Sequence, residues 1–275
     1  MKLKLIAFDM DGTFLDDGKN IPPENLQALQ EANGQGIVLV PATGRIYAGI
    51  PQIIKDLPFI RYFILGNGAQ VFDRETGQVL YRGEISLPLC LRVLDYMETL
   101  PVIYDCYQDG QGWMSEHMFR RIEEFMPDPV MVRYTRSVRT TVPDLRSFLE
   151  ERGRPVQKLQ MHFRDMKELA RQRKLLPEIF PELLACSSVK TNIELNSIDA
   201  GKDKGLQALC RHLGIDICET LAFGDGSNDT AMLKAAGWGV AMANAEEEVL
   251  TAADAITVSN NEAGVAAAMR RWALN

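Results

Sequence analysis

The chain has few of the residues that define disulfide-rich, zinc-binding or membrane proteins. Of its 275 residues, five are cysteines and three are histidines. The cysteine number is odd and no pair has C-x-x-C spacing, which argues against a zinc knuckle, a thioredoxin-type motif and a disulfide framework. No stretch approaches the roughly 18 apolar residues of a membrane-spanning helix. The first apolar run stops at Asp9, short of a signal-peptide core. We therefore expect a cytoplasmic protein with no membrane partner.

Positive charge is also scarce. The sequence has 30 Lys and Arg residues against 37 Asp and Glu residues, so its net charge is −7. Proteins that wrap nucleic acid normally carry a basic stripe, so we expect no nucleic-acid partner. The 46% hydrophobic and 24% charged residues are typical of globular proteins and exclude global disorder. At about 150 residues per domain, the length indicates one large domain or two modest ones.

Short apolar runs alternate with helical stripes at both ends of the chain. Residues 3–8, 37–40 and 220–223 are expected strands, and Pro22-Pro23 is expected to open a helix. This alternation predicts a parallel α/β sheet. Residues 84–189 differ, because helices there are interleaved with strands such as 159–163. The predicted fold is α/β: a Rossmann-like core, residues 1–83 and 190–275, with an inserted α+β domain at 84–189.

The first chemical motif is Asp9-Met10-Asp11-Gly12-Thr13, directly after the first expected strand. A carboxylate can attack phosphorus and form an aspartyl-phosphate. A second carboxylate nearby can act as general acid for the leaving group and then as base for water. The alternative is an Asp-Gly turn with an N-cap aspartate.

Three further motifs follow strand ends or open helices, where open α/β sheets bind their ligands. Thr43-Gly44 offers a hydroxyl and backbone N–H groups to phosphate oxygens. Lys202 or Lys204, at a helix start, could neutralise a phosphoryl group. Asp225 is placed to bind a hard cation such as Mg²⁺, with the Asn-Asp pair at 228–229 orienting the site.

In order and context the four motifs resemble those of the haloacid dehalogenase superfamily, and the resemblance covers the whole chain. The segments Gly224-Asp225-Gly226-Ser227-Asn228-Asp229 and Val240-Ala241-Met242-Ala243-Asn244-Ala245, with Ile193-Glu194-Leu195, are similar to the Cof-type subfamily. That subfamily has an α/β cap between the second and third motifs. The resemblance therefore identifies the insertion at 84–189 as a substrate-specificity cap.

The resemblance also implies a role for each motif residue. Asp9 would be the nucleophile and a Mg²⁺ ligand, and Asp11 the general acid/base with its carbonyl on the metal. Asp225 would complete the metal site and Asp229 would support it. The phosphate-binding groups would be the following: the Met10 N–H, Thr43, Gly44, Lys202 and Asn228. Family members usually have glycine directly after the lysine, but Asp203 follows Lys202; downstream spacing favours Lys202, and Lys204 stays open.

The resulting hypothesis is a Mg²⁺-dependent phosphatase of small phosphomonoesters, such as sugar phosphates or phosphorylated cofactors. One alternative is a phosphomutase of the same superfamily, which would return the phosphoryl group to a sugar. A non-enzymatic phospho-aspartate switch would also use Asp, Thr and Lys around Mg²⁺, but it needs neither Asp11 nor the long insertion. The arginine stretch at 133, 136 and 139 is expected to form a solvated face. The sequence leaves the substrate and the oligomeric state open.

Overall fold

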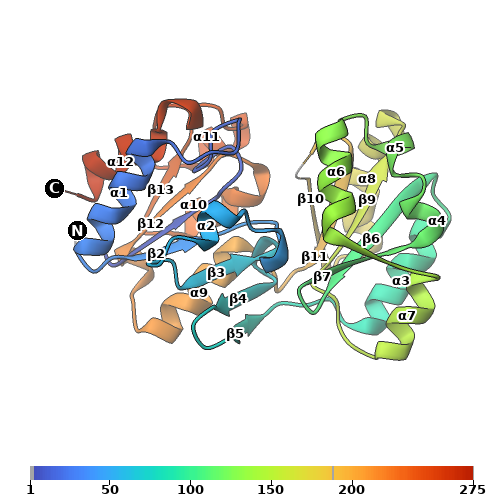
Figure 1. Ribbon diagram of the computed structural model, residues 1–275. Helices are drawn as coiled ribbons and strands as arrows, with labels where there is room; N and C mark the ends of the chain where they lie inside the picture. The colour runs from blue at the N-terminus through green and yellow to red at the C-terminus, as the bar shows by residue number, and fades with distance from the viewer. Residues whose placement is uncertain (1–2, 188, 275) are drawn as a thin grey trace. The chain divides into compact units, whose positions relative to one another are not determined.

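The computed structural model describes residues 3–187 and 189–274. The chain divides into two compact units (Figure 1). The core unit comprises Met1–Gly44, Ile50–Arg82 and Gly201–Asn275, and the cap unit comprises Arg45–Gly49 and Gly83–Ala200. The predicted insertion at 84–189 thus ends too early, because residues 190–200 include a strand that pairs within the cap sheet.

The core unit is built on a five-stranded sheet in the order β14-β13-β12-β1-β2, and every pairing in it is parallel. Its strands are β1 (Leu5–Phe8), β2 (Val38–Pro41), β12 (Thr220–Gly224), β13 (Trp238–Ala241) and β14 (Ala255–Ile256). All four residues of β1 are buried, as expected for a central strand covered on both faces. The predicted parallel α/β core is confirmed.

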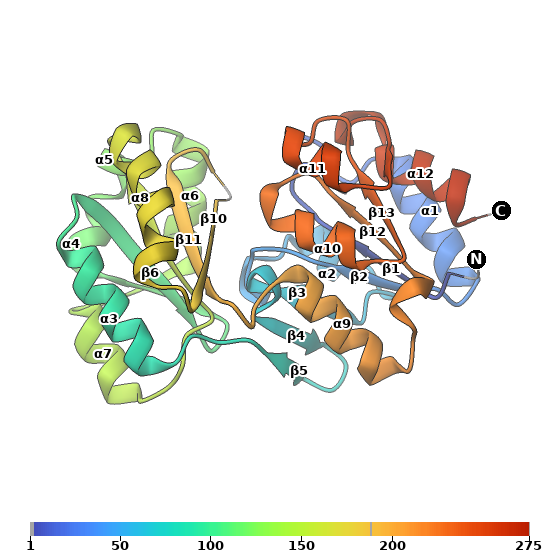
Figure 2. The same cartoon turned by 180° about the vertical axis from the view of Figure 1, so that it is seen from behind.

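Helices cover both faces of this sheet. They are α1 (Pro23–Gly34), α2 (Gln52–Lys55), α9 (Lys202–Leu213), α10 (Thr230–Ala235), α11 (Glu247–Ala252) and α12 (Gly264–Trp272). Leu5 and Ala7 pack in one cluster with α9 and α10. Side chains alternate along a strand, so Ile6 and Phe8 face the opposite layer. There α1 and α12 lie side by side in both views (Figures 1 and 2), linked by the Ala266 N–H donating to the Asn25 side chain.

A small antiparallel sheet extends the open edge of β2. It contains β3 (Tyr62–Leu65), β4 (Gln70–Asp73) and β5 (Gln78–Arg82). The parallel bridge between Ala42 and Ile64 joins β3 to the chain that leaves β2. β4 and β5 form a hairpin around Thr76-Gly77. Consequently β12, β1, β2 and β3 follow one another across the unit with their carboxyl ends on one side.

The cap unit contains a six-stranded sheet in the order β10-β11-β9-β6-β7-β8. Its strands are β6 (Val102–Gln108), β7 (Gln111–Ser115), β8 (Arg139–Val142), β9 (Lys158–Phe163), β10 (Leu183–Cys186) and β11 (Asn192–Ser197). Its helices are α3 (Leu87–Glu98), α4 (Glu116–Phe119), α5 (Ile122–Phe125), α6 (Pro129–Val138), α7 (Leu145–Arg152) and α8 (Met166–Ile179). This mixed unit confirms the expected α+β insertion.

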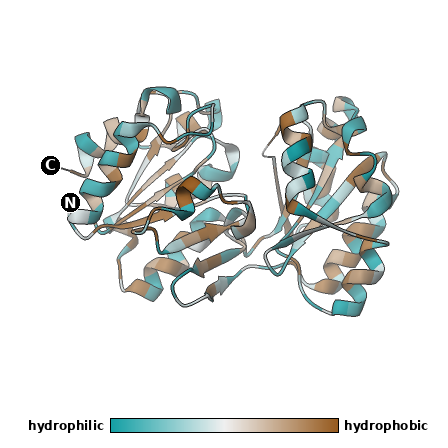
Figure 3. Cartoon of the chain, viewed as in Figure 1, coloured by the Kyte–Doolittle hydropathy of each residue, from teal (hydrophilic) through white to brown (hydrophobic). Residues whose placement is uncertain are grey.

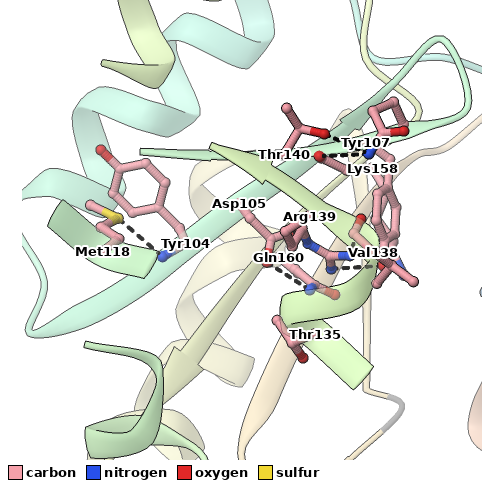
Figure 4. A network of polar contacts seen from close by, with 12 residues as sticks. Tyr104, Asp105, Tyr107, Met118, Thr135, Val138, Arg139, Thr140, Lys158 and Gln160 are labelled. Carbon is pink, nitrogen blue, oxygen red and sulfur yellow. Dashed lines mark hydrogen bonds and ion pairs between the residues drawn. The ribbon is translucent and has the colours of Figure 1, made fainter. Parts of the chain in front are cut away.

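One face of the cap sheet is apolar and the other is polar. Leu159 and Met161 pack into the hydrophobic core, whereas the alternating Lys158 and Gln160 are buried on the opposite face. There Arg139 pairs with Asp105 at 3.0 Å, and both side chains are at most 2% exposed (Figure 4). The expectation that Arg139 belongs to a solvated face is wrong.

Glycine makes that ion pair possible. Arg139 lies on the edge strand β8 opposite Gly112 of β7, and a Cβ on Gly112 would come within 2.7 Å of the Arg139 side chain. The guanidinium therefore crosses β7 over a position that has no side chain. It donates to the Tyr107 hydroxyl at 2.7 Å and stacks 4.4 Å from the Tyr107 ring centre.

Apolar residues concentrate in the strands, and the helices show both colours (Figure 3). Within the described ranges, no helix is both long enough and apolar enough to cross a lipid bilayer.

Candidate active site

The site forms where neighbouring strands of the core unit end. Asp9 follows β1 directly, and Asp225 follows β12, which pairs with β1 along its whole length. Thr43 lies two residues beyond β2, and Asn67 lies two beyond β3. Because parallel strands present their carboxyl ends at one edge, segments far apart in the chain meet there. This explains why the motifs occupy opposite ends of the sequence.

A buried lysine ties two of the acidic residues together. The Lys202 ammonium contacts Asp9 Oδ1 and Asp229 Oδ1, each at 2.6 Å. The Lys202 side chain has no exposed area, and it comes from the first turn of α9. Burial alone would lower the pKa of Lys202, but Asp229 and Asp9 outweigh burial and raise it, so the group is an ammonium.

Lys204 has a different, more exposed environment. Its side chain is 49% exposed, and its nearest acidic partner is Asp203 at 4.0 Å. Of the two lysines that the sequence left open, the structure brings Lys202 to Asp9.

Asp229 uses both of its oxygens on the protein. Oδ1 accepts from Lys202, while Oδ2 accepts from the backbone N–H groups of Asp225 and Gly226, both at 3.1 Å. Gly224 lacks a Cβ where one would meet the Asp229 side chain at 2.3 Å, so the loop can close around that carboxylate. Asp229 therefore holds the loop that carries Asp225.

Asp225 faces the first motif. Thr13 donates its hydroxyl to Asp225 Oδ1 at 2.6 Å. The other oxygen, Oδ2, lies against Gly12, where a Cβ would be 2.3 Å away. Gly12 has a φ of 87°, which favours glycine as well. This glycine thus serves both the turn after Asp11 and the close approach of Asp225.

The acidic cluster is short of positive charge. One oxygen from each of Asp9, Asp225 and Asp229 lies within 4.8 Å of the others. Burial, as the largest cause, raises the pKa of Asp9 well above its usual value, although Lys202 opposes it. Burial likewise raises the pKa of Asp225 to about 6, against the Thr13 hydrogen bond. Within residues 3–187 and 189–274, no hydrogen bond reaches Oδ2 of Asp9 or of Asp225.

Asp11 points to a partner that sequence reasoning missed. Its carboxylate pairs with the Lys19 ammonium at 2.9 Å, and the Asp11 side chain is 33% exposed. Lys19 has a φ of 63°, so the turn after the first motif is held in a left-handed conformation. A positive φ cannot be read from a lysine in sequence. Asn244 was also missed as a contact: its amide donates to the Gly12 carbonyl at 2.8 Å.

The expected phosphate-binding residues line the same strand ends. Met10 is fully buried, and its carbonyl accepts from the Leu15 N–H at 2.9 Å, which closes the loop after Asp9. Thr43 is 2% exposed, and its N–H donates to the Ile64 carbonyl at 2.9 Å. Gly44 follows it, and Asn228 lies at the start of the turn into α10. Their contacts with phosphate stay predictions.

Comparisons with known proteins agree with this arrangement. The sequence pattern of haloacid dehalogenase-like hydrolases matches residues 6–269. Phosphatase YwpJ of Bacillus subtilis is 31% identical, over 98% of this chain and 99% of its own length. A second protein of that organism, the 5-amino-6-(5-phospho-D-ribitylamino)uracil phosphatase YcsE, is 30% identical over 99% of this chain and 96% of its own.

Solved structures show the same fold over the full length. A haloacid dehalogenase-like hydrolase from B. subtilis superposes with a TM-score of 0.86 at 29% identity, covering 98% of this chain and all of that one. A subclass IIB sugar phosphatase of the superfamily gives 0.82 at 27% identity, covering 99% and 100%. The Cof-type resemblance and the expectation of a phosphoric monoester hydrolase are thereby confirmed. The chain belongs to the haloacid dehalogenase-like hydrolase family.

Proposed function

We propose that this enzyme is a Mg²⁺-dependent phosphatase that hydrolyses small phosphomonoesters through an aspartyl-phosphate on Asp9. The observation that carries the proposal is the cluster of Asp9, Asp225 and Asp229, in which the Lys202 ammonium lies between the buried Asp9 and Asp229. A nucleophilic carboxylate, an ammonium beside it and two unshared carboxylate oxygens are what phosphoryl transfer to aspartate requires.

The donor set fits one divalent cation. Three carboxylates and one ammonium leave two negative charges in a buried site. Asp229 has no oxygen to spare, so Asp9, Asp225 and the Asp11 backbone carbonyl are the groups that would hold Mg²⁺. Oxygen ligands with few carboxylates are its usual environment. When bound, the ion would lower the charge barrier between the Asp9 carboxylate and an anionic substrate.

In the first half-reaction, Asp9 attacks phosphorus with a carboxylate oxygen. A bond from that oxygen to phosphorus forms as the bond to the ester oxygen breaks, and Asp11 gives its proton to the departing alkoxide. Lys202 holds Asp9 Oδ1 and offsets charge on the transferring group. The Met10 and Gly44 N–H groups, the Thr43 hydroxyl and the Asn228 amide would hold the phosphoryl oxygens.

In the second half-reaction, the Asp11 carboxylate takes a proton from water as that water attacks phosphorus. The bond to Asp9 breaks, inorganic phosphate leaves, and both aspartates return to their starting forms. The Lys19 ammonium forms an ion pair with the Asp11 carboxylate, and this ionised form of Asp11 is the one that acts as the base.

Relatives suggest the substrate class. Similar proteins include a phosphatase of a phosphorylated ribitylamino-uracil, an HMP-PP phosphatase and a sugar phosphatase. The substrates in these names are small phosphorylated metabolites. We therefore propose sugar phosphates and phosphorylated cofactor precursors as substrates of this enzyme, acting in the cytoplasm.

The test is release of inorganic phosphate from p-nitrophenyl phosphate and from a panel of such metabolites, with Mg²⁺ and with excess chelator. We expect activity only with the metal. Asp9→Asn should reduce turnover by roughly 10³-fold or more. The matched control is Asp56→Asn, since Asp56 is exposed and its side chain accepts a hydrogen bond from Gln52 in its own helical turn. Wild-type turnover in Asp9→Asn would refute the nucleophile assignment.

The same experiment separates the alternatives. A phosphomutase would convert a sugar phosphate to its isomer without releasing phosphate. A phospho-aspartate switch would accumulate stable phosphorylated protein and would not turn over.

A further inference from the structure

The loop after β3 adopts a backbone that few residues tolerate. Gly66, Asn67 and Gly68 all have positive φ, at 58°, 58° and 90°. Asparagine is one of the few residues other than glycine that enters this region readily. Asn67 is also 4% exposed, although it is a polar side chain on a loop. Such a conformation persists only where the surrounding structure determines it.

Asn67 bonds to two of the four motifs. Its N–H donates to the Thr43 carbonyl at 2.9 Å. Its Oδ1 accepts from Asn228 Nδ2 at 3.0 Å. The same oxygen lies where a Cβ on Gly44 would be 2.8 Å away, so only glycine at 44 leaves it room. Asn67 thus links the second motif to the fourth, although Asn228 lies 161 positions further along the chain.

The loop also touches the third motif. A Cβ on Gly68 would lie 1.9 Å from the Gly201 carbonyl oxygen, so these two backbones are in direct contact. Gly201 immediately precedes α9, whose first residue is Lys202. A Cβ on Gly205, in the first turn and a half of α9, would in turn meet Ile64 at 2.7 Å. The loop after β3 therefore packs against the start of the helix that carries the buried lysine.

We propose that Asn67 is a positioning residue of the phosphate site. It fixes the Asn228 amide through its own side chain and the Thr43-Gly44 loop through its backbone, so that both present their donors to the same phosphoryl group. Asn67 itself takes no part in the reaction. This inference rests on the proposed function, in which Thr43, Gly44 and Asn228 bind phosphate.

The test is a double-mutant cycle of Asn67→Gly and Asn228→Ala. Glycine keeps the left-handed backbone accessible and removes the whole side chain, including the oxygen that accepts from Asn228. If Asn67 acts through Asn228, each single variant should lose about tenfold in kcat/KM, and the double variant should lose no more than either. The inhibition constant of orthophosphate should rise by the same factor. Losses that multiply to about a hundredfold would overturn the proposal.

The matched control is Ala263→Gly. Ala263 has a φ of 55°, so this change gives the same backbone relief at a position outside the site, and kcat/KM should not change. If Asn67→Gly fails to fold, Asn67→Asp carries the test. Its carboxylate keeps an acceptor for Asn228, so Asn228→Ala should still cost about tenfold in that background. No further loss there would overturn the proposal.

Orthophosphate binding, measured by calorimetry, separates this inference from the proposed function. A wild-type protein that binds phosphate but does not turn over would refute the phosphatase, and the cycle would then be read in phosphate affinity. A wild-type protein that neither binds nor turns over would overturn both. Turnover with independent losses overturns only the role of Asn67.

Discussion

Replacing Lys202 with methionine tests the electrostatic reasoning most directly. Methionine has nearly the same length, so the change removes the ammonium and leaves little empty volume. It leaves Asp9 and Asp229 without the cation that both contact at 2.6 Å. It also leaves Asp225, whose carboxylate lies within 4.8 Å of theirs, in an uncompensated acidic cluster.

The magnitude follows from burial. The Lys202 side chain has no exposed area, and those of Asp9 and Asp229 are 9% and 1% exposed. Removing one partner of a buried ion pair costs about 3–5 kcal/mol, because the remaining charge stays desolvated. A domain has only about 5–15 kcal/mol of stability, so the loss is a large share of it. We expect Lys202→Met to lose this much stability without metal, and roughly 10²–10³-fold in kcat.

Lys204→Met is the matched control. Lys204 lies two positions away on the same helix, half exposed and 4.0 Å from Asp203. An exposed pair of this kind contributes about 0–1 kcal/mol to stability. The activity of Lys204→Met should stay at the wild-type level. The assay is urea unfolding followed by tryptophan fluorescence in a Trp113→Phe background. Two of the chain's three tryptophans then remain, Trp238 and Trp272, and both report on the core unit.

Saturating Mg²⁺ and low pH should each reduce the stability loss of Lys202→Met. Mg²⁺ would restore part of the missing positive charge, so saturating metal should recover stability but not full activity. Lys202 lowers the pKa of Asp9 and of Asp225, so removing it should raise both pKa values further, and the folded variant should bind protons more tightly than the unfolded chain. Stability of Lys202→Met relative to wild type should therefore fall as pH rises from 5 to 8. A loss under about 1 kcal/mol without metal at pH 7, or an equal loss in Lys204→Met, would refute the reasoning.

Three further outcomes are expected. Burial raises the pKa of Asp225 from the usual aspartate value of 3.8 to about 6, so the metal-free fold should lose about 2–3 kcal/mol of stability as pH rises through that window. The gain in Tm on adding Mg²⁺ should therefore be larger at pH 7 than at pH 5, and an equal gain would contradict this. Gly68→Ala should cost about 2 kcal/mol more than Gly77→Ala in urea unfolding and should also lower kcat/KM, since both have positive φ but only Gly68 meets backbone at the start of α9. Arg139→Met should cost about 3–5 kcal/mol by leaving Asp105 buried without a partner, and Arg139→Met with Asp105→Leu should recover part of that stability; additive losses would show that the pair is not coupled.

The parallel core could be predicted because its signals are local. Short apolar runs such as Leu5–Phe8 end in Asp-Gly or Gly-Asp turns, and parallel strands have to present those turns at one edge. The candidate phosphate-binding lysine could also be narrowed to two positions, because both belong to a short local motif at a helix start. Downstream spacing in the sequence favours Lys202 over Lys204, but their burial had to be seen in the structure, because it depends on each lysine's place on the first turn of α9. That place decides whether an ammonium is buried or half exposed.

The second boundary of the cap could not be predicted because strand pairing is not local. Residues 192–197 read as an apolar and polar alternation next to the third motif, which fits either unit. They form β11, which pairs with β9 and β10, and the sheet partner decides the unit. Arg139 failed for a similar reason. Its neighbours Arg133 and Arg136 suggest a solvated stretch, but its burial depends on Gly112 across the strand and on Asp105 beyond it.

Net charge is a poor guide to the ligand because the acidic residues of the site have different bonding partners. Asp229 spends both oxygens on Lys202 and on backbone N–H groups, so it adds charge without offering a ligand. Asp11 is matched by Lys19. Asp9 and Asp225 each keep an oxygen that no described group hydrogen-bonds, and they belong to a site whose three carboxylates and one ammonium leave a formal excess of two negative charges. An acidic protein can therefore accommodate an anionic substrate, since a single divalent cation would cancel that local excess and Lys202 lies buried beside Asp9, the proposed nucleophile.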